Sequence, residues 1–418
     1  MTPRACYRQA MRAIVPCLVL LAALAPPVAA ENRVVQPPGP ALALPFSPGV
    51  LSDDFLFLSG AIGNEPGVAA VEGDAAAQAR RTIDNLKSVL AAAGLDFSRV
   101  VSGTVFLADA RLLQPVAEAL AASDLEALPP ALTGVEADIA IPNAALEMSA
   151  IAARPGVEVR PITPPGWPAP ALPYSYGVLA GDLLFLAGQV GWNPASGEVP
   201  QDFAAQVEQA LANVGAVLKA AGMDYGNAVT CRVYLADGRD FQAMNEAWKR
   251  VFTSAPPSRA TVRARLADPR FKVEIQCIAA RGAKKVVVAA GESAAGRPFS
   301  PAVQVGDRLF LSGFVGRGRE GYPAGVAAQT RRVLERLAAT LAAAGMSFAD
   351  VVNAEVYLSD VRFYAAMNEV YGKTMPKPPP ARATVGSQLM SPEALVEIAM
   401  IAVRSSSAGG ENGAGDGE

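Results

Sequence analysis

Pro257-Ser258-Arg259-Ala260-Thr261, with Val273-Glu274-Ile275 downstream, is one of three near-copies of the same ending in this chain. The other two are Pro129-Pro130-Ala131-Leu132-Thr133 with Leu146-Glu147-Met148, and Pro380-Ala381-Arg382-Ala383-Thr384 with Val396-Glu397-Ile398. In every copy the glutamate lies 15 residues after the Arg or Leu position, and the copies are about 125 residues apart. A repeat of this length predicts one structural unit written three times. The first copy differs from the others because Leu132 stands at the arginine position.

Each copy has the same order of expected elements, namely strand, strand, helix, strand, helix and strand. Short apolar runs that end at a small residue and glycine predict buried strands, and these runs are Phe55–Leu58, Leu183–Leu186 and Arg308–Leu311. Apolar residues at helical spacing follow, and each such helix is expected to end at a glycine in the left-handed conformation, at Gly94, Gly222 and Gly345. A shorter helix is expected after Asp109, Asp237 and Asp360, and the glutamate-bearing strand ends the unit. One sheet with two helices leaves one sheet face uncovered, so an α+β chain with three such faces packed together is predicted.

The units are expected to span residues 43–154, 171–281 and 297–404. Proline is frequent between residues 161 and 170, which predicts a semi-rigid spacer. The second boundary, residues 282–296, is rich in alanine and glycine and is expected to be flexible. The tail 405–418 has Gly, Ser and acidic residues without an apolar face, so disorder is expected there.

The N-terminus has the pattern of a cleaved secretory signal peptide over residues 1–30. Arg4, Arg8 and Arg12 precede an apolar run over residues 14–25, which is short for a membrane span; a retained anchor is the alternative. Cleavage predicts a periplasmic or secreted protein with no membrane attachment. It leaves 388 residues with 33 basic and 39 acidic side chains, a net charge of −6. That balance gives no support for binding nucleic acid, which depends chiefly on basic surface.

Cysteine and histidine restrict the chemistry further. Cys231 and Cys277 are the cysteines outside the expected signal peptide. They could form a disulfide in an exported protein, or remain free buried thiols in apolar strands. The chain has no histidine, which excludes Ser-His-Asp and Cys-His catalysis and His-ligated metal. No metal site and no cofactor are expected, so any catalysis must use carboxylate, guanidinium, amide, hydroxyl and backbone groups.

Several stretches of the second unit together resemble the RidA (YjgF/YER057c/UK114) enamine/imine deaminases. They are Leu172-Pro173-Tyr174-Ser175, Leu186-Ala187-Gly188-Gln189, residues 193–199, Met244-Asn245-Glu246, and the arginine and glutamate stretches quoted above. The resemblance covers the second unit end to end and the other two at lower fidelity. It implies a chorismate-mutase-like α+β fold, which in the family forms homotrimers with ligand pockets between subunits. Three fused units would then form an intramolecular pseudo-trimer that is monomeric.

The resemblance implies hydrolysis of reactive imines or enamines of small 2-amino acids to 2-keto acids and ammonia, without a cofactor. The implied catalytic residues are Glu274 and Glu397, and the implied substrate-binding residues are Arg259, Arg382, Tyr174, Asn245, Asn368 and Ser312. Arginine presents a planar fork that binds a carboxylate bidentately, and partial burial raises the pKa of a glutamate toward neutrality. The alternative is a non-catalytic protein that binds small carboxylates or a partner on the same fold. Ribonuclease activity, proposed for some relatives, is disfavoured by the missing histidines and the acidic balance.

The departures from the family pattern predict how many pockets work. The first unit has Leu132 for the arginine and Ala117 for the asparagine. At the position of the family tyrosine, the first unit has Phe46 and the third has Phe299. At the position of the family serine, the second unit has Ala187. If a pocket takes its arginine and asparagine from different units, one pocket survives, pairing Arg259 with Asn368 or Arg382 with Asn245. If both come from one unit, two pockets survive.

Overall fold

The structure, a computed structural model, describes residues 32–40, 43–122 and 128–405. The expected signal peptide, and the expected disordered tail from residue 406 onward, lie outside the described residues. No described helix combines the length and the apolar character that a membrane span needs.

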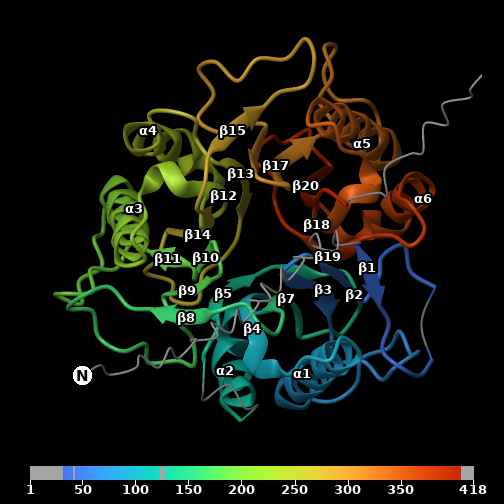
Figure 1. Ribbon diagram of the computed structural model, residues 1–418, viewed down its shortest axis with the longest axis horizontal. Coiled ribbons are helices and arrows are strands. Elements are labelled where there is room, and N and C mark those ends of the chain that lie inside the picture. The colour runs from blue at the N-terminus through green and yellow to red at the C-terminus, as the bar shows by residue number, and fades with distance from the viewer. Residues whose placement is uncertain (1–31, 41–42, 123–127, 406–418) are drawn as a thin grey trace, which may run out of the picture.

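The described residues form three consecutive sets of strands and helices (Figure 1). The first set is β1 (Arg33–Val35), β2 (Gly49–Ser52), β3 (Phe55–Ala61), α1 (Ala75–Ala92), β4 (Val100–Leu107), α2 (Leu113–Ala121), β5 (Ala131–Glu136), β6 (Asp138–Ile139) and β7 (Leu146–Ala153). The second is β8 (Val159–Ile162), β9 (Gly177–Ala180), β10 (Leu183–Leu186), β11 (Gln189–Val190), α3 (Phe203–Ala220), β12 (Ala228–Leu235), α4 (Phe241–Val251), β13 (Ser258–Arg263) and β14 (Val273–Ala280). The third is β15 (Lys284–Val287), β16 (Ala302–Val305), β17 (Arg308–Val315), α5 (Val326–Ala343), β18 (Val351–Leu358), α6 (Tyr364–Thr374), β19 (Ala381–Gly386) and β20 (Val396–Val403). The prediction of three tandem α+β units is therefore confirmed.

Each unit forms one sheet, and the third sheet also includes β6 of the first unit. The sheet orders are β1-β2-β3-β7-β4-β5, β13-β12-β14-β10-β9-β8 with β11 on β14, and β15-β16-β17-β20-β18-β19-β6. The glutamate-bearing strand lies inside each sheet, while the strand at the Arg or Leu position pairs in parallel with its neighbour β4, β12 or β18. The long helices end as expected, because Gly94, Gly222 and Gly345 have φ of +75°, +71° and +67°.

Two local features differ from the elements expected from the sequence. The expected order has no strand directly after the prolines, but Ser258–Arg263 is strand β13, with Arg259 only 2% exposed. The reason is the parallel pairing with β12, which the local sequence does not show. The boundary segments are also more ordered than their composition indicates: β8 includes Pro161 and pairs with β9, and β15 pairs with β16.

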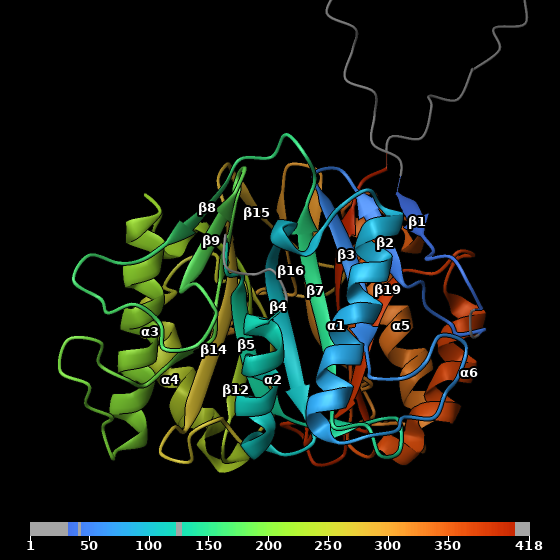
Figure 2. The same ribbon diagram turned by 90° about the horizontal axis from the view of Figure 1, so that it is seen from below.

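The three sheets share buried cores. Helices cover one face of each sheet, on the outside of the molecule in both views (Figures 1 and 2). The opposite faces meet in a cluster to which every unit contributes, including Phe55, Phe185 and Phe310. Backbone N–H and C=O groups that are buried in such a core need hydrogen-bond partners, and the hydrogen bonds between neighbouring strands provide them. Correspondence of this arrangement to a family trimer stays an expectation from the resemblance.

Backbone contacts link neighbouring units in a closed order. Strand β6 of the first unit pairs with β19 of the third, and single bridges join Val135 to Leu266 and Val262 to Leu389. A serine in each unit also donates its hydroxyl to a proline carbonyl of the unit before it in this ring, with Oγ–O distances of 2.6 Å; the pairs are Ser47 with Pro379, Ser175 with Pro129, and Ser300 with Pro256. These prolines directly precede the strand with the Arg or Leu position. Each interface therefore places that strand beside the neighbouring unit.

Cys231 and Cys277 form a disulfide across the adjacent strands β12 and β14. The two residues are direct partners in the strand register, with Cα atoms 4.1 Å apart. Of the two possibilities that the sequence left open, the structure has the disulfide.

Candidate functional site

Arg382 of the third unit lies at the interface with the first unit and is 2% exposed. Its Nη2 donates to Oδ1 of Asn368 at 2.7 Å, and its backbone N–H donates to Oγ of Ser59 at 2.7 Å. The guanidinium carbon is 4.7 Å from the ring centre of Tyr371 and 4.9 Å from that of Phe46. Ser59 and Phe46 belong to the first unit, so two units build the surroundings of this one cation.

Arg259 of the second unit repeats this arrangement at the interface with the third. Its Nη2 donates to Oδ1 of Asn245 at 2.6 Å, and its backbone N–H donates to Oγ of Ser312 at 2.8 Å. The guanidinium carbon lies 4.9 Å from the Trp248 ring and 5.1 Å from the Phe299 ring. Burial lowers the pKa of Arg259 to about 9, so the side chain remains cationic at neutral pH.

A buried glutamate from the neighbouring unit faces each arginine. Glu147 of the first unit accepts the backbone N–H of Thr384 at Oε1, at 3.0 Å, and Glu397 of the third unit accepts that of Thr261. Burial raises the pKa of both glutamates from 4.5 to about 7. The Thr384 N–H and Arg382 act in the opposite direction on Glu147, and Arg232, the Thr261 N–H and Arg259 do so on Glu397. A carboxyl group with a pKa of about 7 can exchange a proton near neutral pH, which general acid–base catalysis would need.

A glycine packs against the carboxyl group of each glutamate. The backbones of Gly60, Gly188 and Gly313 lie against the carboxyl groups, so that an added Cβ would be 1.9, 1.8 and 1.8 Å from Oε1 of Glu147, Glu274 and Glu397. Any larger residue would displace the carboxyl group. This contact explains the glycine that ends each of the short apolar runs.

The third interface lacks the cation. Leu132 and Ala117 of the first unit stand where the other interfaces have arginine and asparagine, and they line a cavity of about 200 Å³. Tyr174 and Glu274 of the second unit line the same cavity. Burial raises the pKa of Glu274 to about 8, and no charged side chain contributes to that shift.

The structure thus groups the expected site residues differently from the sequence spacing. Arginine and asparagine of a site come from one unit, which is the case that leaves two arginine sites. Glu397 faces Arg259 rather than the arginine of its own unit. Glu274 and Tyr174 lie together but away from both arginines, in the interface with Leu132. The 15-residue spacing therefore does not bring an arginine and a glutamate into one site, and a catalytic role for Glu274 stays a prediction from the resemblance.

Sequence reasoning missed residues at both arginine sites. Glu147 belongs to the Arg382 site, and its presence in a unit without an arginine was the available signal. Trp248 and Tyr371, three residues after the site asparagines, were not recognised as stacking partners. The indole N–H of Trp248 and the hydroxyl of Tyr371 are buried without a hydrogen-bond partner, as are Nε and Nη1 of Arg382.

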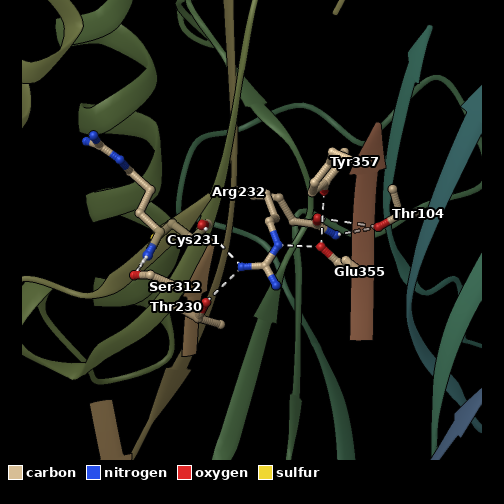
Figure 3. Close-up of polar contacts among 9 residues, drawn as sticks. Thr104, Thr230, Cys231, Arg232, Ser312, Glu355 and Tyr357 are labelled. Carbon is tan, nitrogen blue, oxygen red and sulfur yellow. Dashed lines mark hydrogen bonds and ion pairs between the residues drawn. The ribbon is translucent and has the colours of Figure 1, made fainter. Parts of the chain in front are cut away.

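A separate polar cluster lies between the sheets near their shared core (Figure 3). Nε of Arg232 in the second unit pairs with Glu355 of the third, Arg232 Nη1 donates to Thr230 Oγ1 at 3.0 Å, and the Tyr357 hydroxyl donates to Glu355 at 3.1 Å. The cluster borders a cavity of about 50 Å³. Both charges are already paired, so this cluster is a structural ion pair rather than a binding site. Among the described residues, no group of His, Cys, Asp and Glu is arranged to hold a metal ion.

The fold and these sites define a class of protein, one with three fused α+β units and with buried arginine, asparagine and glutamate side chains at the interfaces between them. The family model described as Endoribonuclease L-PSP matches residues 38–154, 166–281 and 290–404. The chain therefore belongs to this family, and the resemblance to RidA is confirmed.

Individual relatives match one unit of the chain. The goat protein named 2-iminobutanoate/2-iminopropanoate deaminase is 42% identical over 116 residues, 28% of this chain and 85% of that protein. Protein DfrA of Myxococcus xanthus is 44% identical over 110 residues, 26% of this chain and 84% of that protein. A solved chorismatase structure covers 73% of this chain and 93% of its own at 16% identity and a TM-score of 0.51, which is a similarity of fold.

Proposed function

We propose that the protein hydrolyses imines or enamines of small 2-amino acids to 2-keto acids and ammonia, at the Arg259 and Arg382 sites. The observation that carries this proposal is the pairing, at each of two interfaces, of a buried arginine from one unit with a buried glutamate from the next. The deaminase names of single-unit relatives support the same chemistry.

The arginine binds the substrate carboxylate in this proposal. At the Arg382 site, Asn368 occupies Nη2 and leaves Nε and Nη1 without a protein partner. Nε has one N–H group and Nη1 has two, and these unpaired donors are available to the oxygens of a carboxylate. The asparagine and the stacked rings fix the plane of the guanidinium, so little freedom is lost when the ligand binds.

The glutamate moves the protons. When water adds to C2 of the protonated imine, the C=N π electrons move to nitrogen and Glu147 takes a proton from the water. Glu147 then donates this proton to the amine nitrogen and accepts the remaining hydroxyl proton as the C–N bond breaks. The 2-keto acid and ammonia leave, and Glu147 releases one proton to solvent. A carboxyl group with a pKa of about 7 performs both transfers efficiently at neutral pH.

The surroundings favour small substrates. Aromatic rings enclose each guanidinium, with Phe46 and Tyr371 at one site and Phe299 and Trp248 at the other. The different rings lead us to expect different side-chain preferences at the two sites. We expect this enclosure to restrict the ligand to a small 2-imino acid.

We also place this activity in the periplasm or outside the cell. Residues 1–30 have the composition of a signal peptide, and the Cys231–Cys277 disulfide suits an oxidising compartment. Sequencing the N-terminus of the exported protein tests this placement, since it should begin near residue 31 rather than at Met1.

The test of the function is ammonia release from freshly generated 2-iminopropanoate and 2-iminobutanoate. The wild type should release ammonia faster than buffer alone, and Arg259→Ala/Arg382→Ala should lose at least ~100-fold of that rate. Arg250→Ala, which removes an exposed arginine paired with Glu208, is the matched control and should keep the wild-type rate. A folded wild type that binds 2-oxobutanoate but gives no rate above buffer would instead support a non-catalytic carboxylate-binding protein.

A further inference from the structure

The interface between the first and second units holds a cavity that differs in chemistry from the two arginine sites. Its volume is about 200 Å³, which is comparable with the ~150 Å³ apolar cavities that bind benzene-sized molecules. Leucine, valine, alanine, proline and phenylalanine side chains form most of its lining. The polar side chains in its lining are those of Glu274, Tyr174 and Thr133, and the Thr133 hydroxyl is buried without a hydrogen-bond partner.

The equivalent positions of the other interfaces show what this cavity lacks. At those interfaces a guanidinium faces the glutamate, and a backbone N–H donates to it. Here Leu132 replaces the arginine, and the glutamate receives no hydrogen bond from the described residues. Ala117 replaces the asparagine that holds the arginine in place. The site has therefore kept its carboxyl group and lost the positive charge opposite it.

Glu274 is well positioned for a ligand despite this loss. It is 6% exposed, and the backbone of Gly188 holds its carboxyl group in the same place as at the other interfaces. The titratable groups that face it are the hydroxyls of Tyr174 and Tyr234, which are neutral because burial raises their pKa values. A buried carboxyl group with no cation and no donor is costly, and a ligand that supplies a cation removes that cost.

We propose that this cavity binds a small apolar primary amine, whose ammonium group pairs with the carboxylate of Glu274 while its hydrocarbon part fills the space beside Leu132. The Tyr174 ring adds an aromatic surface close to the cation. A carboxylate ligand is disfavoured, because this interface has no guanidinium to bind it. This interface is thus a second type of binding site and does not depend on deaminase activity at the other two.

Isothermal titration calorimetry with three molecules of one shape, isobutylamine, isobutanol and isobutyrate, tests the proposal. Isobutylamine should bind saturably at one site per chain. Because Glu274 has a pKa of about 8, it is mostly neutral at pH 7, so binding of the ammonium form should release close to one proton. Titrations in buffers of different ionisation enthalpy measure that release. Isobutanol should bind about ten-fold more weakly or worse, and isobutyrate should not displace the amine.

Two variants locate the site. Glu274→Gln keeps the shape of the side chain and should weaken isobutylamine binding about ten-fold or more, with no proton release. Leu132→Phe keeps the carboxyl group of Glu274 but narrows the cavity, and it should also weaken isobutylamine binding. The test therefore needs only one of the two variants to fold. The proposal is overturned if isobutylamine does not bind, if isobutanol displaces it equally well, or if a folded variant at either position binds it as the wild type does.

Discussion

Leu132→Arg combined with Ala117→Asn should convert the interface between the first and second units into a third arginine site. Glu274 and the glycine beside it already occupy the positions that Glu147 and Glu397 have at the other interfaces. The cavity of about 200 Å³ beside Leu132 gives space for the longer side chain. The new asparagine should hold the guanidinium as Asn245 and Asn368 hold theirs.

The size of the effect follows from the differences among the three glutamates. Glu274 has a pKa of about 8, whereas Glu147 and Glu397, each with an arginine and a backbone donor, have pKa values of about 7. The backbone donor accounts for part of this difference, so the new arginine should lower the pKa of Glu274 by at most about one unit, or ~1.4 kcal/mol. The number of carboxylate ligands bound per chain should rise from two to three.

Calorimetric titration with 2-oxobutanoate measures this stoichiometry, and carbon NMR of labelled glutamate measures the pKa. Leu132→Met/Ala117→Asn is the matched control, because it keeps an apolar side chain of similar volume, and it should bind two ligands. A folded Leu132→Arg/Ala117→Asn variant that still binds two ligands, with the pKa of Glu274 unchanged, would refute the account of what the interface lacks.

Three further predictions concern stability and the arginine position. Burial raises the pKa of Glu147 and Glu397 from 4.5 to about 7, so the folded state binds more protons than the unfolded chain between these pH values. The stabilisation that comes from this protonation is complete below pH 4.5 and is lost as the pH rises through 7. In urea unfolding across that pH range, glutamine at both positions should reduce the fall in the free energy of unfolding by ~3 kcal/mol per glutamate. If the pH dependence of stability stays unchanged, the assignment is contradicted. Alanine at both Cys231 and Cys277, which are 46 residues apart in sequence, should lower the free energy of unfolding by up to ~4 kcal/mol; equal stability with and without reductant in the wild type would argue against the disulfide. Ser59→Ala should lower the free energy of unfolding by ~1–3 kcal/mol, because it leaves a buried backbone N–H without an acceptor, and a change near zero would show that the N–H finds another partner.

Much of the fold could be predicted from the sequence because the information is local. The repeat identifies the units, the apolar runs identify buried strands, and Gly94 and its equivalents mark the helix ends at positive φ. The strand that carries Arg259 could not be predicted in the same way. Prolines precede it, and its pairing partner β12 lies about 30 residues earlier in the chain.

The candidate site could be predicted in its residue types but not in its grouping. Arg382 and Asn368 lie in one unit, 14 residues apart, whereas Glu147 reaches the same site from more than 200 residues away. Spacing within a repeat cannot show which neighbour completes a site between repeats, because that depends on the direction in which the units follow one another around the shared core. A glutamate kept in the unit that has lost its arginine indicates that it serves another unit.

The central claim is that each working site pairs an arginine with the glutamate of the neighbouring unit, and two double variants test it most directly. Arg259→Ala/Glu397→Gln should disable one site and leave the Arg382 site active, with ammonia release close to that of Arg259→Ala alone. Arg259→Ala/Glu147→Gln should disable both sites and lose a further ~10²–10⁴-fold. If arginine and glutamate instead act within one unit, the two results are exchanged: the first double variant is inactive and the second keeps the rate of Arg259→Ala.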